Sequence, residues 1–190
     1  REHFLEALQA LPDSAWTSRL MCLSGLTQQA LLRGELEAAQ RLNREALCLA
    51  RVHGSLVLEA LLELDHAQLL EQRGAPYRAQ SLLETVQAML AGQRLTAGPL
   101  VGRIVLRRGH LALRQGQDGL AAECFEAGLS MCLQSQDKRV LYGFLGLALL
   151  AANRGDYAQA FIQLRDAERL MQQRHVPDTV YRAVLLLSLI

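Results

Sequence analysis

The stretch RGELEAAQ at residues 33–40 returns in altered form three times along this chain, as RGAPYRAQ (73–80), QGQDGLAA (115–122) and RGDYAQAF (154–161). The second residue of each stretch is a glycine, and successive glycines are 40, 42 and 39 residues apart. Glycine commonly ends a helix, because it enters the left-handed backbone region without a Cβ clash. The four stretches therefore predict a repeated helix–turn–helix unit.

Small residues recur at fixed distances from these glycines. Five residues after the glycines lie Ala39, Ala79, Ala121 and Ala160. Twelve residues after them lie Ala46, Val86, Gly128 and Ala167, and seven residues before them lie Thr27, Ala67, Gly109 and Ala148. Small side chains let two antiparallel helices approach closely, while bulky residues nine positions after the glycine, such as Leu83, Phe125 and Leu164, fill the space between helix pairs. We therefore expect the four alanines of the first set to be buried.

Composition agrees with an all-α fold. Leu and Ala together number 67, whereas Val, Ile and Thr together number 17. Unbranched and small side chains lose little rotamer freedom in a helix, while β-branched side chains favour strands. The expected architecture is a solenoid of antiparallel helix pairs with a period of about 40 residues.

Periodicity, turn glycines and prolines predict ten helices, at 2–11, 14–32, 35–52, 56–73, 76–91, 99–115, 118–134, 137–154, 156–174 and 178–190. Ser14, Asp118, Asp137, Asp156 and Asp178 stand at or beside predicted starts, where a side-chain oxygen can accept from free amides. We expect a single repeat domain over 1–190, with four repeats at 14–55, 56–96, 97–136 and 137–176 and partial repeats at both ends. The chain is then a fragment of a longer protein, and its apolar ends would allow homo-oligomerisation.

Charge and hydropathy exclude several classes of protein. The net charge is +1 with acids and bases interspersed, so we expect neither nucleic-acid nor membrane contact. The longest apolar stretch, 140–152, is shorter than the roughly 20 residues of a membrane-spanning helix. The four cysteines show no CxxC spacing, which indicates small buried hydrophobes in a reducing cytoplasm. We expect a cytoplasmic protein.

The pattern of small residue, turn glycine, alanine and bulky apolar residue resembles the tetratricopeptide repeat over about residues 14–178. The usual period is 34 residues, and the proline that usually closes each repeat is missing here. The resemblance implies a right-handed superhelical solenoid with a concave binding surface. The first helix of each pair would line this surface, at Met21, Ser24, Gln28, Leu31 and Leu32; Leu61, Leu64, Gln68, Glu71 and Gln72; Arg103, Leu106, His110, Leu113 and Arg114; and Tyr142, Leu145, Leu149, Ala152 and Asn153.

Polar members of this stripe are the candidate ligand contacts: Gln28, Gln68, Gln72, Arg103, His110, Arg114, Tyr142 and Asn153. Arg103, His110 and Arg114 share one helix face, and guanidinium groups suit carboxylate or phosphate recognition. The amides could bond sugar hydroxyls or peptide backbone. The alternative, that the arginines only form a solvated helix face, stays open.

Three longer motifs, "ALLRGELEAAQ…EALCLAR", "AGPLVGRIVLRRGHLALRQGQ…AAECFEAGL" and "ALLAANRGDYAQAFIQLRDAERLM", resemble the helical-repeat arm of MalT-like, LuxR-type transcription regulators of the signal-transduction ATPase class. In that family a P-loop ATPase module precedes the arm and a helix-turn-helix follows it. The resemblance implies that the arm senses a small-molecule inducer, a sugar oligomer in the founding member, and communicates with the other domains. Neither flanking motif occurs in this sequence.

The sequence contains little that indicates a catalytic site. Asp65 and His66 are adjacent in a predicted helix and point in different directions, and GFLG at 143–146 follows no strand and is no phosphate loop. Metal-ligand spacing is absent. We therefore expect no enzyme, metal or cofactor. Two hypotheses remain: the inducer-sensing arm of a MalT-like regulator, or a stand-alone tetratricopeptide adaptor that docks a partner peptide or helix.

Overall fold

The computed structural model describes residues 2–137 and 139–174, and the chain divides into two compact units, residues 1–94 and 95–190. The described residues are helical with turns between helices and contain no strand. Among them, no helix combines the length and the apolar character that crossing a membrane requires. The helix expected at 178–190, its cap Asp178 and the apolar C-terminal end lie outside the described residues.

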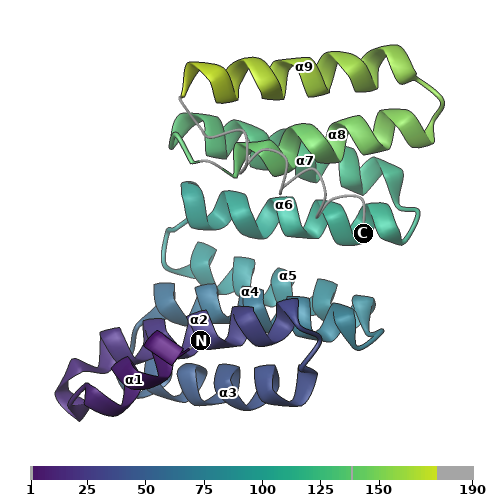
Figure 1. Cartoon of the computed structure of the whole chain (residues 1–190). Coiled ribbons are helices and arrows are strands. Elements are labelled where there is room, and N and C mark those ends of the chain that lie inside the picture. Colours follow the sequence, from purple (N-terminus) through teal and green to yellow (C-terminus); the bar gives the residue numbers. More distant parts are fainter. Residues whose placement is uncertain (1, 138, 175–190) are drawn as a thin grey trace. The chain divides into compact units, whose positions relative to one another are not determined.

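The first unit holds five α-helices, which pack on their neighbours in chain order: α1 with α2, α2 with α3, α3 with α4, and α4 with α5 (Figure 1). Short turns of three residues between α2 and α3, and between α4 and α5, make each pair antiparallel. The helices are α1 Glu2–Ala10, α2 Trp16–Leu32, α3 Leu36–Val52, α4 Leu56–Gln72 and α5 Pro76–Gly92, with a 3₁₀ helix η1 at Asp13–Ala15.

The second unit repeats this arrangement with two helix pairs. Its described helices are α6 Pro99–Arg114, α7 Asp118–Gln134, α8 Val140–Asn153 and α9 Tyr157–Gln173. The first helix of one pair also touches the first helix of the next within each unit, α2 with α4 and α6 with α8. Nine of the ten expected helices are thus present, within three residues of the expected bounds.

The turn glycines act as the sequence predicts. Gly34, Gly74, Gly116 and Gly155 all have positive φ, between 70° and 79°. After the first of them, the backbone N–H of Glu35 donates to the carbonyl of Ala30 at 2.9 Å, and the same bond recurs in the other three repeats. This hydrogen bond, from a backbone N–H to the carbonyl five residues earlier, satisfies a carbonyl that the helix end would otherwise leave free. The repeat register is therefore confirmed.

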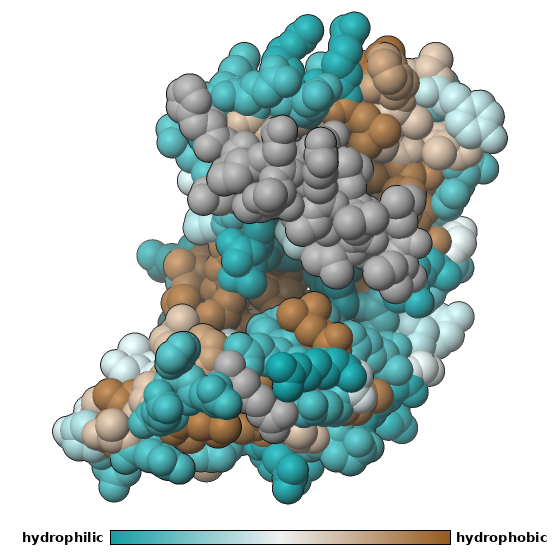
Figure 2. Space-filling view, in the orientation of Figure 1, coloured by the Kyte–Doolittle hydropathy of each residue, from teal (hydrophilic) through white to brown (hydrophobic). Residues whose placement is uncertain are grey.

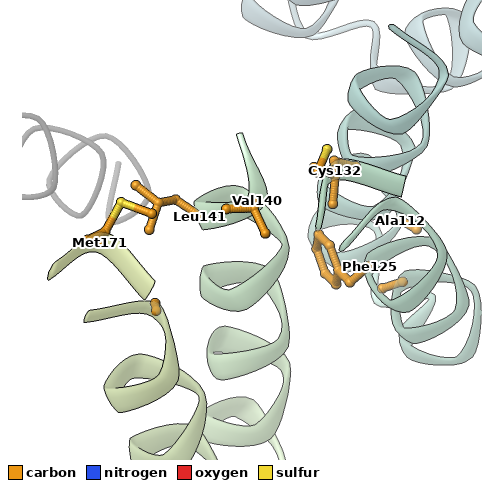
Figure 3. Packing of buried hydrophobic residues seen from close by; sticks show 9 residues of the cluster. Ala112, Phe125, Cys132, Val140, Leu141 and Met171 are labelled. Carbon is orange, nitrogen blue, oxygen red and sulfur yellow. The ribbon is translucent and has the colours of Figure 1, made fainter. Parts of the chain in front are cut away.

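Small residues bring the helices together as expected. Ala39, Ala79 and Ala121 are fully buried and Ala160 is 8% exposed. In the second unit, Phe125 of α7 is fully buried, and a Cβ added at Gly109 of α6 or at Gly146 of α8 would meet its ring. Figure 3 shows Phe125 with neighbours from the same buried cluster, and Leu141 of α8 beside Met171 of α9.

The largest difference between an expected and an observed helix start is at α8. α8 begins at Val140 rather than 137, because the Asp137 carboxylate accepts the backbone N–H of Arg139 at 2.8 Å and holds the chain in a turn. Asp156 caps α9 as predicted, accepting from the backbone N–H of Gln159 at 3.0 Å. The cap prediction was wrong for Asp118, whose carboxylate lies 3.4 Å from the Arg154 guanidinium instead.

The cysteines divide into two kinds. Cys22, Cys124 and Cys132 are buried, as expected, but Cys48 on α3 is exposed. The expectation that all four are buried was therefore wrong, because Cys48 lies on the solvent side of α3. Burial raises the pKa of the Cys132 thiol to about 11.

We expect a maleimide at neutral pH to label one thiol per folded chain quickly and all four after unfolding. The thiolate is the reactive species, and a buried thiol ionises less readily and is shielded from the reagent. Mass spectrometry of the labelled peptides measures this. Cys48→Ser should abolish the fast reaction, and fast labelling of Cys124 or Cys132 in the folded chain would contradict the burial.

Candidate functional site

Gln28 and Ser24 of α2 both bind the same carboxylate on α4. The Gln28 side-chain amide donates to Asp65, and the Ser24 hydroxyl donates to the second Asp65 oxygen at 3.2 Å. Asp65 is only 6% exposed. Because a buried carboxylate is costly unless it is hydrogen-bonded, these donors stabilise the approach of α2 to α4. The side-chain amide of Gln28, one of the candidate ligand contacts, is thus engaged by Asp65.

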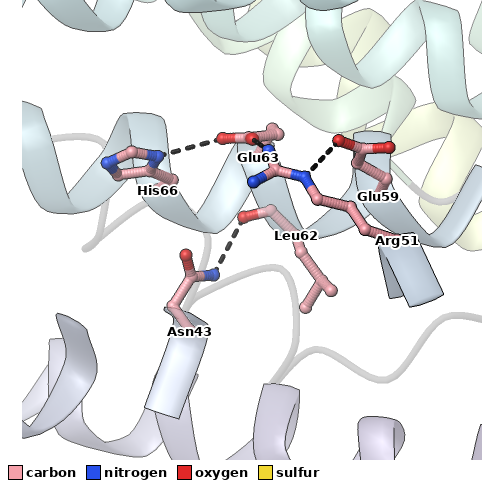
Figure 4. A network of polar contacts seen from close by, with 6 residues as sticks. All are labelled: Asn43, Arg51, Glu59, Leu62, Glu63 and His66. Atoms are coloured by element: carbon pink, nitrogen blue, oxygen red, sulfur yellow. Dashed lines mark hydrogen bonds and ion pairs between the residues drawn. The ribbon is translucent and has the colours of Figure 1, made fainter. Parts of the chain in front are cut away.

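A second polar cluster joins α3 to α4 (Figure 4). The Arg51 guanidinium lies 2.7 Å from the Glu59 carboxylate and 2.8 Å from that of Glu63. The hydrogen bond to Glu59, opposed by burial and assisted by the charges of both carboxylates, raises the pKa of Arg51 above its ordinary value. His66 Nδ1 lies 2.9 Å from the other Glu63 oxygen, so this half-buried histidine is satisfied and forms no dyad with Asp65.

The remaining stripe residues of the first unit present a mixed surface. Gln68 is half-buried and Gln72 is exposed near the end of α4. On α2, Met21 and Leu32 are 51% and 69% exposed, large fractions for apolar side chains. Their spacing of eleven residues, about three turns, puts them on one face. Apolar side chains thus occur among amides on this stripe.

His110 is the centre of the candidate site in the second unit. Its ring meets the Phe125 ring edge-on, with centroids 4.9 Å apart, and the Tyr142 ring at 6.3 Å. Nε2 is buried and has no hydrogen-bond partner within the described residues. Burial, with a smaller effect of the Arg107 charge and an opposing hydrogen bond to the Tyr142 backbone, lowers the pKa of His110 to about 4. His110 is therefore neutral at pH 7.

The other candidates of the second unit differ in accessibility. Arg103 and Tyr142 are half-buried, whereas Arg114 and Asn153, the last residues of α6 and α8, are exposed. The structure brings His110 and Tyr142 together across α6 and α8. Ligand contact by any of the eight residues stays a prediction.

Sequence reasoning missed the polar clusters around Asp65 and Glu63. Both acids lie inside LVLEALLELDHAQLL (56–70), an otherwise largely apolar helix. Charged residues in such a run signal buried polar pairs, because a buried charge requires partners. The partners themselves, Ser24, Gln28 and Arg51, come from other helices.

Trp16 and His53 form another contact that the sequence did not reveal. Their rings stack with centroids 4.2 Å apart and an interplanar angle of 7°. Trp16 begins α2 and His53 follows the end of α3, so the stack connects the two helices at the end of the pair that is opposite to their turn. Over residues 2–137 and 139–174, no group of three His, Cys, Asp or Glu side chains could hold a metal ion.

We expect Arg51→Ala to lower the free energy of unfolding by about 1–2 kcal/mol, because Glu63 loses one of its two partners while buried. The value is below that of a fully buried pair, since the Arg51 side chain is 56% exposed. Urea unfolding measures it. Arg44→Ala, on the exposed side of the same helix, is the matched control, and equal stabilities of the two variants would refute the role given to Arg51.

Three comparisons place this geometry among known proteins. A protein-family model described as the MalT-like TPR region matches residues 1–188. No curated protein matches by sequence. The structure is similar to BtubC (BKLC) from P. vanneervenii, with a TM-score of 0.68 and 16% identity over 92% of this chain and 72% of that chain.

The apo form of RapI is similar as well, with a TM-score of 0.68 and 13% identity over 91% of this chain. The aligned part covers 50% of the RapI chain, so this chain spans about half of that protein. At these identities the two structures show the fold alone, that of helical-repeat proteins.

Proposed function

This chain belongs to the family of MalT-like TPR regions, and on that basis we propose that it is the ligand-sensing and interaction arm of a LuxR-type, MalT-like transcriptional regulator in the cytoplasm. A helical-repeat domain of this kind serves protein interaction. The finer role is to bind a small-molecule inducer, or the regulator's other domains, on the stripe formed by the first helices of the pairs. The single observation that carries the proposal is the family match over residues 1–188.

The chemistry of the stripe supports a small polar ligand with apolar faces. Met21 and Leu32 offer exposed apolar surface in the first unit, and Gln72 adds an amide. Arg114 and Asn153 add a guanidinium and an amide in the second unit. Small-molecule sites usually combine apolar walls with a few polar groups that orient the ligand. Taken one unit at a time, groups of these kinds suit sugar oligomers, because amides and guanidinium groups bond hydroxyls while apolar side chains pack on the ring faces.

A thermal-shift screen of linear sugar oligomers tests the proposal. We expect at least one oligomer to raise the melting temperature, because a ligand that binds only the folded state stabilises it. A protein that instead responds to none of them and binds a partner peptide would be the stand-alone adaptor. The gene offers an independent check, since a P-loop ATPase segment and a helix-turn-helix flanking this region are expected only for the regulator.

We expect Arg103→Ala and Arg114→Ala to weaken binding of the responding oligomer about tenfold, the loss of one charged hydrogen bond. Arg114 is exposed, so its replacement should change stability by less than about 0.5 kcal/mol. Calorimetric titration and thermal melts measure the two effects. Arg44→Ala on α3 is the control, because Arg44 is exposed and lies off the stripe. Unchanged affinity in both variants would remove the arginines from the site, and a collapsed melting temperature would show that they are structural.

A further inference from the structure

Each of the two units has a buried core of its own. In the first unit, Leu20 and Leu62 are fully buried in one cluster with residues of α3. In the second unit, Phe125 and Leu141 are buried in a cluster that draws residues from α6, α7, α8 and α9. Much of the visible surface of each unit is hydrophilic (Figure 2). Both units, residues 1–94 and 95–190, exceed the roughly 55–65 residues of small domains that fold alone.

The connection between the units is long and exposed. α5 ends at Gly92 and α6 begins at Pro99, so six residues separate them, whereas three separate α3 from α4 and five separate α7 from α8. Residues 93–97 are all exposed. Arg94 has a φ of 62°, in the left-handed region that residues with a side chain seldom adopt, and the comparable residue after α3 is Gly54 with a φ of 64°. Exposed backbone of this kind is where proteases cut folded proteins.

An ion pair links successive helix pairs inside each unit. In the first unit, the Arg73 guanidinium lies 3.5 Å from the Glu37 carboxylate in the first turn of α3. In the second unit, Arg154 lies 3.4 Å from the carboxylate of Asp118, the first residue of α7. Both arginines directly precede a turn glycine. At the boundary between the units the sequence has neither partner, because Gln115 precedes the turn glycine and the first turn of α5 contains no acidic residue.

We propose that the two units unfold separately, so that residues 1–94 stay folded when residues 95–190 unfold. In a repeat protein each repeat contacts only its neighbours, so a weakly coupled joint divides the array into parts that unfold independently. The connection 93–98 is then the place at which a protease of tryptic specificity separates the two parts, after Arg94. Both properties hold with or without a bound inducer.

Buried thiols report the unfolding of each unit in the full chain. Cys22 is buried in the first unit, and Cys124 and Cys132 are buried in the second. A Cys48→Ser background removes the exposed thiol, and mass spectrometry then follows maleimide labelling of each remaining cysteine. A buried thiol reacts when the structure around it opens, so its labelling rate follows the free energy of that opening.

Matched core truncations in the two units provide the test. Phe125 and Leu62 are both fully buried. We expect Phe125→Ala to speed labelling of Cys124 and Cys132 at least about a hundredfold, while the rate at Cys22 stays within about twofold. Leu62→Ala should speed labelling of Cys22 at least about thirtyfold and leave the other two rates unchanged. If Phe125→Ala unfolds the second unit completely, the protection of Cys22 still decides the question.

Trypsin provides a second measurement on the same variant. In Phe125→Ala the second unit opens and is degraded, so we expect a lasting fragment that ends at Arg94. Adding Arg94→Gly should move the end of this fragment to Arg103, the next arginine in the sequence. Glycine suits the left-handed backbone at this position, so the substitution removes the cleavage site without straining the connection.

Three results would overturn the proposal. The first is labelling of Cys22 that rises in Phe125→Ala by the same factor as labelling of Cys132, because the chain would then unfold as one. The second is labelling of Cys132 that Phe125→Ala leaves unchanged, because the second unit would then not open as a whole. The third is digestion of Phe125→Ala that leaves no fragment of the first unit.

Discussion

Gly146→Ala is expected to destabilise the second unit by about 1–3 kcal/mol, the usual cost of overpacking a closed core. A Cβ at this position would lie 2.3 Å from a ring carbon of Phe125. The ring cannot move away, because Phe125 is fully buried and a Cβ at Gly109, on another helix, would come within 2.9 Å of it. α8 must therefore shift away from α7 or the ring must leave its preferred rotamer, and both lose packing.

Helix propensity opposes the clash by favouring the new alanine, so a control variant must measure the effect of propensity separately. Alanine is favoured over glycine inside a helix by about 1 kcal/mol, which partly offsets the clash. Gly119→Ala on α7 should show the propensity gain alone, because nothing lies within 4 Å of a Cβ there. Urea unfolding followed by circular dichroism measures both variants. Phe125→Leu should relieve part of the cost in a double-mutant cycle, and a Gly146→Ala variant as stable as Gly119→Ala would contradict the packing.

Acidification from pH 7 to pH 4 is expected to cost the second unit about 3 kcal/mol through His110 alone. The folded-state pKa of His110 is lowered to about 4 from its ordinary 6.5, chiefly by burial. The unfolded chain therefore binds the proton first, so the contribution to stability is complete above pH 6.5. It is lost progressively as the pH falls from 6.5 towards 4.

His110→Gln isolates this effect from the titration of the carboxylates. Glutamine keeps an amide that can bond the Tyr142 backbone but does not titrate. We expect the variant to be less stable than the wild type at pH 7, because it loses the ring contacts with Phe125 and Tyr142, and to lose less stability on acidification. Denaturant unfolding at several pH values measures the slope. Equal slopes in the two proteins would show that the folded chain does not lower the pKa of His110.

Local patterns were enough to place most helices and the repeat register. A turn glycine ends its helix through its own backbone conformation, and the alanine five residues later lies in the first turn of the next helix. Both can therefore be recognised in a single sequence. The glycines of GFLG at 143–146 were correctly placed inside a helix, in α8. Sequence did not reveal why they are glycines: Gly146 makes room for Phe125, which comes from α7.

The candidate site was less accessible to sequence reasoning. Helical spacing correctly put Arg103, His110 and Arg114 on α6, since they lie within one helix. It could not show that the His110 ring packs against Phe125 and Tyr142, because these rings come from two other helices. Helical spacing made Gln28 a candidate ligand contact, but its hydrogen bond to Asp65 depends on how α2 meets α4.

The sequence by itself determined that this protein is an all-α repeat, where its helix pairs turn and which small residues lie between them. These properties depend on the backbone freedom of glycine and on the helical period, both of which act over a few residues. Tertiary structure alone decided that the half-buried His110 is neutral, that Arg51 bridges Glu59 and Glu63, and that Cys48 is exposed. The physical reason is that burial and ion pairing depend on which side chains of neighbouring helices meet, and residues far apart in the chain carry no local signal of that meeting.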